Sequence, residues 1–198
     1  TFNNLNINNS AAATCDLTVN VSSSITVSGL LTVTNGISAT GTRTITLNTG
    51  TINANGGLTV QGPAASTGGG GTATIKVNGA AAAHTITTPT TAGAITPLCN
   101  LEFNSSVAKT ITISGGNQIT VGTNASTKTF TVSGSGDITI NTGVISCKGD
   151  ITSTNTGTAG GGNATISIDG TGTQNFTGTG VGTEGQGRLP NVTINKWV

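Results

Sequence analysis

The sequence predicts an all-β fold and, within that class, a parallel β-solenoid built from many short strands. The composition favours strands and turns over helices, because the 198 residues include 42 Thr, 31 Gly and 21 Asn. Polar and apolar residues alternate with a period of two, as expected of strands with one buried face. Clusters of Gly, Asn or Ser separate these runs about every 8 to 12 residues, a spacing typical of many short strands.

Strands are expected wherever this alternation is clear. In chain order they are Leu17–Val19, Ile25–Val27, Leu31–Val33, Thr44–Asn48, Leu58–Val60, Ile75–Val77, Thr110–Ile113, Ile119–Val121, Thr129–Val132, Ile138–Ile140 and Thr165–Ile168. No stretch has a 3.6-residue apolar period long enough to predict a helix. The chain is therefore expected to contain strands and turns only.

A longer repeat lies above the alternation. Ile45–Gly50 returns as Ile138–Gly143, 93 residues later, and Gly69–Gly79 returns as Gly160–Gly170, 91 residues later. A third segment, with Asn at both ends, occurs three times, at Asn4–Asn8, Asn100–Asn104 and Asn191–Asn195. We therefore divide the chain into a first solenoid repeat (1–97), a second repeat (98–188) and the first strand of a third repeat or an inter-subunit strand (189–198).

Two architectures fit this pattern, a parallel β-solenoid and a pair of antiparallel β-sandwiches. The short strands, the Gly- and Asn-rich turns and the small aromatic fraction of 3% favour the solenoid, whose narrow interior Ile, Val, Leu and Ala can fill. With roughly 20 to 25 residues in a coil, the chain would form about eight or nine coils and a rod about 40 Å long.

The charge balance excludes some classes of partner. Seven Lys and Arg against six Asp and Glu cannot form the basic surface that nucleic acids require. No apolar run is long enough to span a membrane, and no signal-peptide pattern is present.

We also expect no enzymatic activity, no cofactor and no metal site. Asp137 and Asp150 are close enough in sequence to approach one another on neighbouring turns, but Asp beside Gly is usually a turn former. Calcium at Gly134–Asp137 is a weaker alternative. The only histidine, His84, follows four Ala in an irregular stretch, so a loop or surface position is expected.

The three cysteines, Cys15, Cys99 and Cys147, show no metal-binding spacing. Buried small side chains are one interpretation. An internal disulfide of unknown pairing with one free thiol is another, and an intersubunit disulfide is a third.

Thr-X-Thr pairs raise the hypothesis of an ice-binding surface. The pairs are Thr32/Thr34, Thr44/Thr46, Thr72/Thr74, Thr85/Thr87, Thr110/Thr112 and Thr129/Thr131. An ice-binding face needs such a pair once per coil on one side, whereas these recur at unequal intervals of 12 to 28 residues. The simpler interpretation is that these threonines occupy the solvent-facing positions of ordinary strands.

Four segments, Thr1–Ser10, Leu31–Gly36, Asp169–Gly178 and Leu189–Lys196, resemble repeats of large secreted surface proteins common among Bacteroidetes-type bacteria. The resemblance implies a β-solenoid repeat of an adhesin or extracellular fibre, at the cell surface. It includes no catalytic motif, so it implies no functional residues.

The ends of the predicted solenoid suggest how such units associate. Neither end shows a capping helix or charged loop, and unpaired strand edges invite head-to-tail pairing. We expect a structural subunit or segment of an extracellular filament or adhesin, with a homo-oligomer as its state. The expected subunit interface consists of Leu5, Ile7, Val192, Ile194 and Trp197. A carbohydrate- or ice-binding surface module, with a surface glycan as one partner, is the alternative, and a polysaccharide-acting β-helix enzyme is a weaker one.

Overall fold

A computed structural model confirms the all-β parallel solenoid and not the pair of sandwiches. It describes residues 1–9, 14–18, 20, 23–35, 44–61, 71–88, 97–116, 118–124, 128–178 and 186–196. Within these residues every paired strand runs parallel to its neighbour, and no helix is present. Accordingly, the described residues contain no helix that could cross a membrane.

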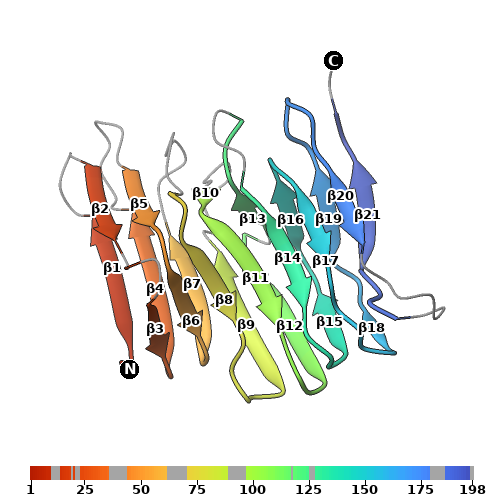
Figure 1. The fold of residues 1–198 in the computed structure, drawn as a ribbon, viewed down its shortest axis with the longest axis horizontal. Helices are drawn as coiled ribbons and strands as arrows, with labels where there is room; N and C mark the ends of the chain where they lie inside the picture. Colours follow the sequence, from red (N-terminus) through yellow and green to blue (C-terminus); the bar gives the residue numbers. More distant parts are fainter. Residues whose placement is uncertain are drawn as a thin grey trace.

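The strands form faces that the chain visits in turn (Figure 1). Face 1 is a seven-stranded sheet of β1 (Leu5–Asn9), β4 (Leu30–Asn35), β7 (Gly57–Gln61), β9 (Ala83–Thr88), β12 (Lys109–Gly115), β15 (Ile138–Asn141) and β18 (Gly160–Gly161). Face 2 is a five-stranded sheet of β10 (Pro97–Leu98), β13 (Gln118–Val121), β16 (Val144–Cys147), β19 (Thr165–Ile168) and β21 (Asn191–Ile194). In the first two coils its place in chain order is taken by β2 (Thr14–Thr18) and β5 (Thr44–Asn48), which pair with each other.

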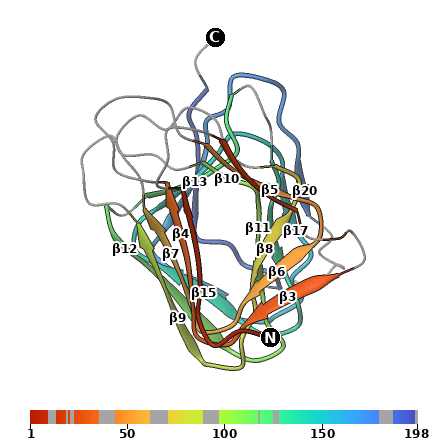
Figure 2. The same cartoon turned by 90° about the vertical axis from the view of Figure 1, so that its left-hand side faces the viewer.

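Face 3 closes each coil and is again seven-stranded. Its strands are β3 (Ser24–Val27), β6 (Thr51–Ala54), β8 (Thr74–Val77), β11 (Asn100–Asn104), β14 (Phe130–Ser133), β17 (Ile151–Ser153) and β20 (Phe176–Gly178). Viewed along the rod, the faces enclose one common interior (Figure 2).

The coils are longer than the sequence suggested. On face 1, Leu5 pairs with Leu31 and Leu31 with Leu58, which are offsets of 26 and 27 residues, and the offsets along this face range from 22 to 29. The estimate of 20 to 25 residues allowed too little chain for the corners between faces. Faces 1 and 3 therefore have seven strands each, fewer than the eight or nine coils expected.

Rows of inward-pointing side chains fill the interior. On face 3 one row runs Ile25, Ile52, Ile75, Leu101, Phe130 and Ile151, each paired with the next in register. Phe103 and Phe130 meet edge to face, with ring centroids 5.2 Å apart and ring planes at 84°. Buried residues from Ile7 to Ile168 belong to one hydrophobic cluster, so the core is continuous along the rod.

The glycine run at Gly160–Gly162 forms the short strand β18 (Gly160–Gly161) and the residue after it. All three residues have positive φ, of 132°, 95° and 101°. A Cβ at Gly162 would also overlap the carbonyl oxygen of Ile140 on the previous coil. Only glycine meets both conditions without strain.

The copies of the sequence repeat lie on different faces. The three Asn-flanked segments fall on β1, β11 and β21, which belong to faces 1, 3 and 2 respectively. From β1 to β11 the chain makes three coils and passes two further faces, so the repeat is not a whole number of coils. Sheets continue across both predicted boundaries, since β9 pairs with β12 and β19 with β21. The division at residues 97 and 188 stays a prediction.

Candidate functional site

The outer surface of face 1 carries rows of threonine hydroxyls in register. Thr32 pairs with Thr59, Thr59 with Thr87, and Thr87 with Ser114, so four successive strands place a hydroxyl at one position. These side chains alternate with buried neighbours such as Leu31 and therefore point outward. All four are half-buried, so their outer atoms remain accessible.

Two shorter rows lie beside the first. Thr85 pairs with Thr112, and Thr110 pairs with Thr139. Within the part of the chain that the structure describes, none of these four hydroxyls, nor that of Thr87, hydrogen bonds to another protein group. They are free to bind something outside the protein.

No charged side chain projects from this outer surface among the described strands of face 1. The single charged residue in these strands, Lys109 of β12, points inward and is only 2% exposed. The surface is therefore broad, uncharged and rich in hydroxyls, which suits a ligand that is itself uncharged and regular.

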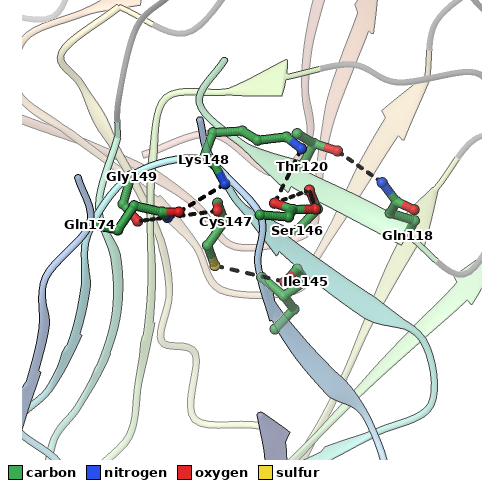
Figure 3. Close-up of polar contacts among 10 residues, drawn as sticks. Gln118, Thr120, Ile145, Ser146, Cys147, Lys148, Gly149 and Gln174 are labelled. Carbon is green, nitrogen blue, oxygen red and sulfur yellow. Dashed lines mark hydrogen bonds and ion pairs between the residues drawn. The ribbon is translucent and has the colours of Figure 1, made fainter. Parts of the chain in front are cut away.

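Ion pairs lie on face 3 and next to face 2, although the described strands of face 2 themselves contain no charged residue. Directly after strands β16 and β19, Lys148 Nζ lies 3.2 Å from Asp169 Oδ1, and Ser146 Oγ donates to both Asp169 oxygens, at 2.8 and 3.0 Å. Figure 3 shows Ser146 and Lys148 at this corner. On face 3, Lys76 Nζ lies 3.1 Å from Glu102 Oε1. Since these groups satisfy one another, they serve the framework.

The side chain of Gln174 hydrogen bonds to the backbone at a corner of the solenoid, near the ion pair of Lys148 and Asp169. Its Nε2 donates to the carbonyl oxygens of Cys147 at 2.9 Å and Gly149 at 2.6 Å, and its Oε1 accepts from the Gly170 amide at 2.8 Å (Figure 3). This amide stabilises backbone groups on adjacent coils and is a structural element.

His84 lies in the interior, contrary to the loop or surface position expected from the sequence. It is 2% exposed on β9, and its Nε2 donates to the Asn55 carbonyl oxygen at 2.6 Å. Nδ1 is then an acceptor and faces Lys109 Nζ at 3.3 Å. His84 lies two residues before the buried Ile86, so the alternation of the strand directs both side chains inward. The run of alanines before His84 hid this alternation in the sequence.

Lys109 completes this buried polar cluster. Its Nζ donates to the carbonyl oxygens of Gly79 at 2.5 Å and Ala81 at 3.1 Å. Burial lowers the pKa of Lys109. Burial also lowers the pKa of His84 below 6.5, an effect that the Lys109 charge adds to and the Asn55 hydrogen bond opposes. The cluster is shielded from solvent and its donors are used, so it fits a structural role.

The carboxylates considered for catalysis do not form a site. Asp137 precedes β15 and its Oδ1 accepts from the Ala159 amide at 2.7 Å, whereas Asp150 precedes β17 and its Oδ1 accepts from the Asn175 amide at 2.8 Å. The two therefore lie at different corners of the coil. No group of three or more His, Cys, Asp or Glu is placed to hold a metal among the residues the structure describes.

Cys99 and Cys147 are free thiols in the buried interior. Burial raises the pKa of Cys99 to about 12 and also raises the pKa of Cys147. These two cysteines are not joined to each other. Cys15 belongs to β2, but its side chain lies outside the described residues, so its pairing stays open.

The expected interface residues divide between the two ends of the rod. On β21, Val192 is 43% and Ile194 73% exposed, although they pair with the buried Ile166 and Ile168. At the opposite end Leu5 is half-buried and Ile7 is buried, in spite of their position on the edge strand β1. Trp197 lies outside the described residues.

A third exposed side chain that continues a row of the core lies at the same end of the rod, on the last strand of face 3, and the sequence did not reveal it. Phe176 of β20 is 50% exposed and pairs with buried Ile151. It lines an open cavity of about 170 Å³ together with Leu189 and Ser153. That Phe176 pairs with the inward-pointing Ile151 is known only from the register of β17 and β20, which the sequence does not give.

Comparison with protein-family models, with curated proteins and with solved structures finds no match to this chain.

Proposed function

We propose that this chain is a structural β-solenoid segment of an extracellular bacterial filament or adhesin, which associates head to tail through its end strands. The observation that carries the proposal is the exposure of core-row side chains on β21 and β20. Val192, Ile194 and Phe176 each continue a row of core side chains, and the residue with which each of them pairs on the preceding coil is buried.

A further coil stacked on this end, such as one from a second copy, would bury these side chains and pair the edge of β21 that has no partner strand among the described residues. Complete burial of an aliphatic or aromatic side chain stabilises by roughly 1.5–3 kcal/mol, so Ile194, which is 73% exposed, would contribute roughly 1–2 kcal/mol. Unpaired strand edges add main-chain hydrogen bonds to this gain.

The opposite end offers a complementary edge. The outer edge of β1 has no partner strand among the described residues, and Phe2, which forms a bridge to Val27, is 49% exposed. A net charge of +1 gives little electrostatic repulsion between copies. If the rotation between copies does not close, such a contact produces a filament.

Sedimentation and electron microscopy of the purified chain test the association, and a charge at the exposed core row should abolish it. We expect the unmodified chain to form filaments about one solenoid wide. Ile194→Lys should leave single particles, because the substituted ammonium would have to be buried. Thr193→Lys is the matched control, since Thr193 is exposed on the same strand but points outward, and it should retain filaments. Single particles of the unmodified chain at high concentration would refute the association.

The extracellular assignment has a separate test. It is supported by the resemblance of four segments to secreted surface repeats and by the low charge. Antibody against the purified chain should label intact cells that produce it. Labelling only after the cells are permeabilised would contradict the assignment.

A further inference from the structure

We propose that the outer surface of face 1 binds ice. The inference is independent of end-to-end association, because it concerns the side of the rod. The juxtaposition that carries it is the register of Thr32, Thr59, Thr87 and Ser114 on four successive strands, flanked by the rows of Thr85 and Thr110.

The spacing of these hydroxyls defines a two-dimensional lattice. Neighbouring strands lie about 4.8 Å apart, and residues two apart on one strand are separated by about 6.6–6.8 Å. Oxygen rows on the faces of hexagonal ice repeat with comparable spacings in two perpendicular directions. Water molecules held by the hydroxyl rows can therefore join an ice surface with little displacement.

The chemistry of the rows suits this ligand. A threonine hydroxyl has one donor and two acceptor sites, and those of Thr85, Thr87, Thr110 and Thr112 make no hydrogen bond to the protein in the described residues. The β-branched side chain is restricted at χ1, and strands β9 and β12 are each paired with a neighbouring strand on both sides. Such positions are preorganised, so little conformational entropy is lost on binding.

The absence of charge from the described outer surface of face 1 is the second argument. An ammonium or carboxylate holds its own strongly oriented hydration shell, which an ice lattice does not accommodate. Face 3 shows the contrast: its central outward row includes Thr26, Thr131 and Thr152, but Lys76 and Glu102 interrupt it.

Stacking of sugar rings on this surface is less well supported. Binding of glycans in that mode relies on exposed aromatic side chains. Among the described residues, Phe103 and Phe130 are buried, and Phe2 and Phe176 lie at the ends of the rod. We therefore commit to ice.

Ice recrystallisation tests the proposal with two matched variants. We expect the unmodified chain to slow the growth of ice grains, and Thr87→Lys, at the centre of the face 1 row, to lose this effect at concentrations where the unmodified chain acts. Thr131→Lys changes the same residue type at a half-buried outward position on face 3 and should act like the unmodified chain. Equal melting temperatures by circular dichroism will show that both variants are folded.

Three results would overturn the inference. They are no effect of the unmodified chain on grain growth, equal loss of effect in both variants, and retention on crystalline cellulose or chitin without any effect on ice. Repeating the assay with Ile194→Lys separates this inference from the proposed association. That variant should remain active on ice, whether or not the unmodified chain forms filaments.

Discussion

Replacement of Asn155 by Ala should lower the free energy of unfolding of the solenoid. The size of the loss can be worked out from the hydrogen bonds that the Asn155 side chain makes. Asn155 is 5% exposed at a corner after β17. Its Nδ2 donates to the carbonyl oxygens of Ser133, Gly134 and Gly136, at 3.2, 3.1 and 2.9 Å, and its Oδ1 accepts from the Gly157 amide at 3.0 Å.

Two of these four backbone groups would lose their partner. The Ser133 and Gly134 carbonyls also accept backbone amides, from Ser105 and Thr156 respectively. The Gly136 carbonyl and the Gly157 amide have no other partner among the described residues. A buried unsatisfied group costs about 1–3 kcal/mol, so we expect a loss of about 3 kcal/mol in the free energy of unfolding. For a chain of this size that loss corresponds to about 6–12 °C in melting temperature.

Asn155→Asp sharpens the test because it keeps the shape of the side chain. The carboxylate would still accept from the Gly157 amide, but its second oxygen would face three carbonyl oxygens in place of a donor. The loss at pH 7 should therefore exceed that of Asn155→Ala. It should shrink as the pH falls towards the unfolded Asp pKa of about 3.9, because the folded state would then bind the proton more tightly than the unfolded state.

Thermal and denaturant melts of both variants measure these losses. Thr154→Ala, an exposed neighbour at the same corner, is the control and should change the free energy of unfolding by about 0.5 kcal/mol or less. A loss below about 1 kcal/mol for Asn155→Ala, or an Asn155→Asp variant as stable as the unmodified chain at pH 7, would refute the reasoning.

Two further predictions concern buried titratable groups. Because the folded pKa of His84 lies below 6.5, unfolding takes up a proton in mild acid, and stability should fall as the pH drops below 6.5 until it reaches the folded pKa. Melts from about pH 8 to pH 5 measure this slope, which His84→Gln should flatten; an unchanged slope in that variant would contradict it. The raised pKa of Cys99 and Cys147 predicts that neither reacts with a thiol reagent at about pH 8 until the chain is unfolded, and rapid labelling of either in the native state would contradict it.

The fold class and many of the strands were accessible from the sequence because both depend on local alternation, whereas β6, β9, β16 and β17 were not expected. Thr44–Asn48 is β5 with the expected bounds, and the expected Thr129–Val132 is β14 within one residue at each end. The register was not accessible, because neighbours in a solenoid are a whole coil apart and the coil length varies. The regular spacing of Thr32, Thr59 and Thr87 was therefore missed, since Thr59 has no threonine two residues away.

Buried polar residues were missed for a different reason. Lys109 lies two residues before Ile111, and His84 two before Ile86, so the alternation places both on the inward side. The usual cost of burying such groups argues against that assignment. Only the fold shows that the Gly79 and Ala81 carbonyls and the partner side chain provide the compensating hydrogen bonds.

The geometry of the sequence repeat bears on why face 1 is uniform. The repeat advances the chain by three coils and two further faces, so a copy of a face 1 strand falls on face 3, as β1 and β11 show. The hydroxyl row on face 1 nevertheless continues from Thr87, before residue 97, to Ser114, after residue 98. Copying a threonine-rich strand by the repeat would place its hydroxyls on another face and could not extend this row. The register of the row thus arises from positions that are not copies of one another, so the repeat by itself does not account for it. The ice-binding role proposed for face 1 would account for it.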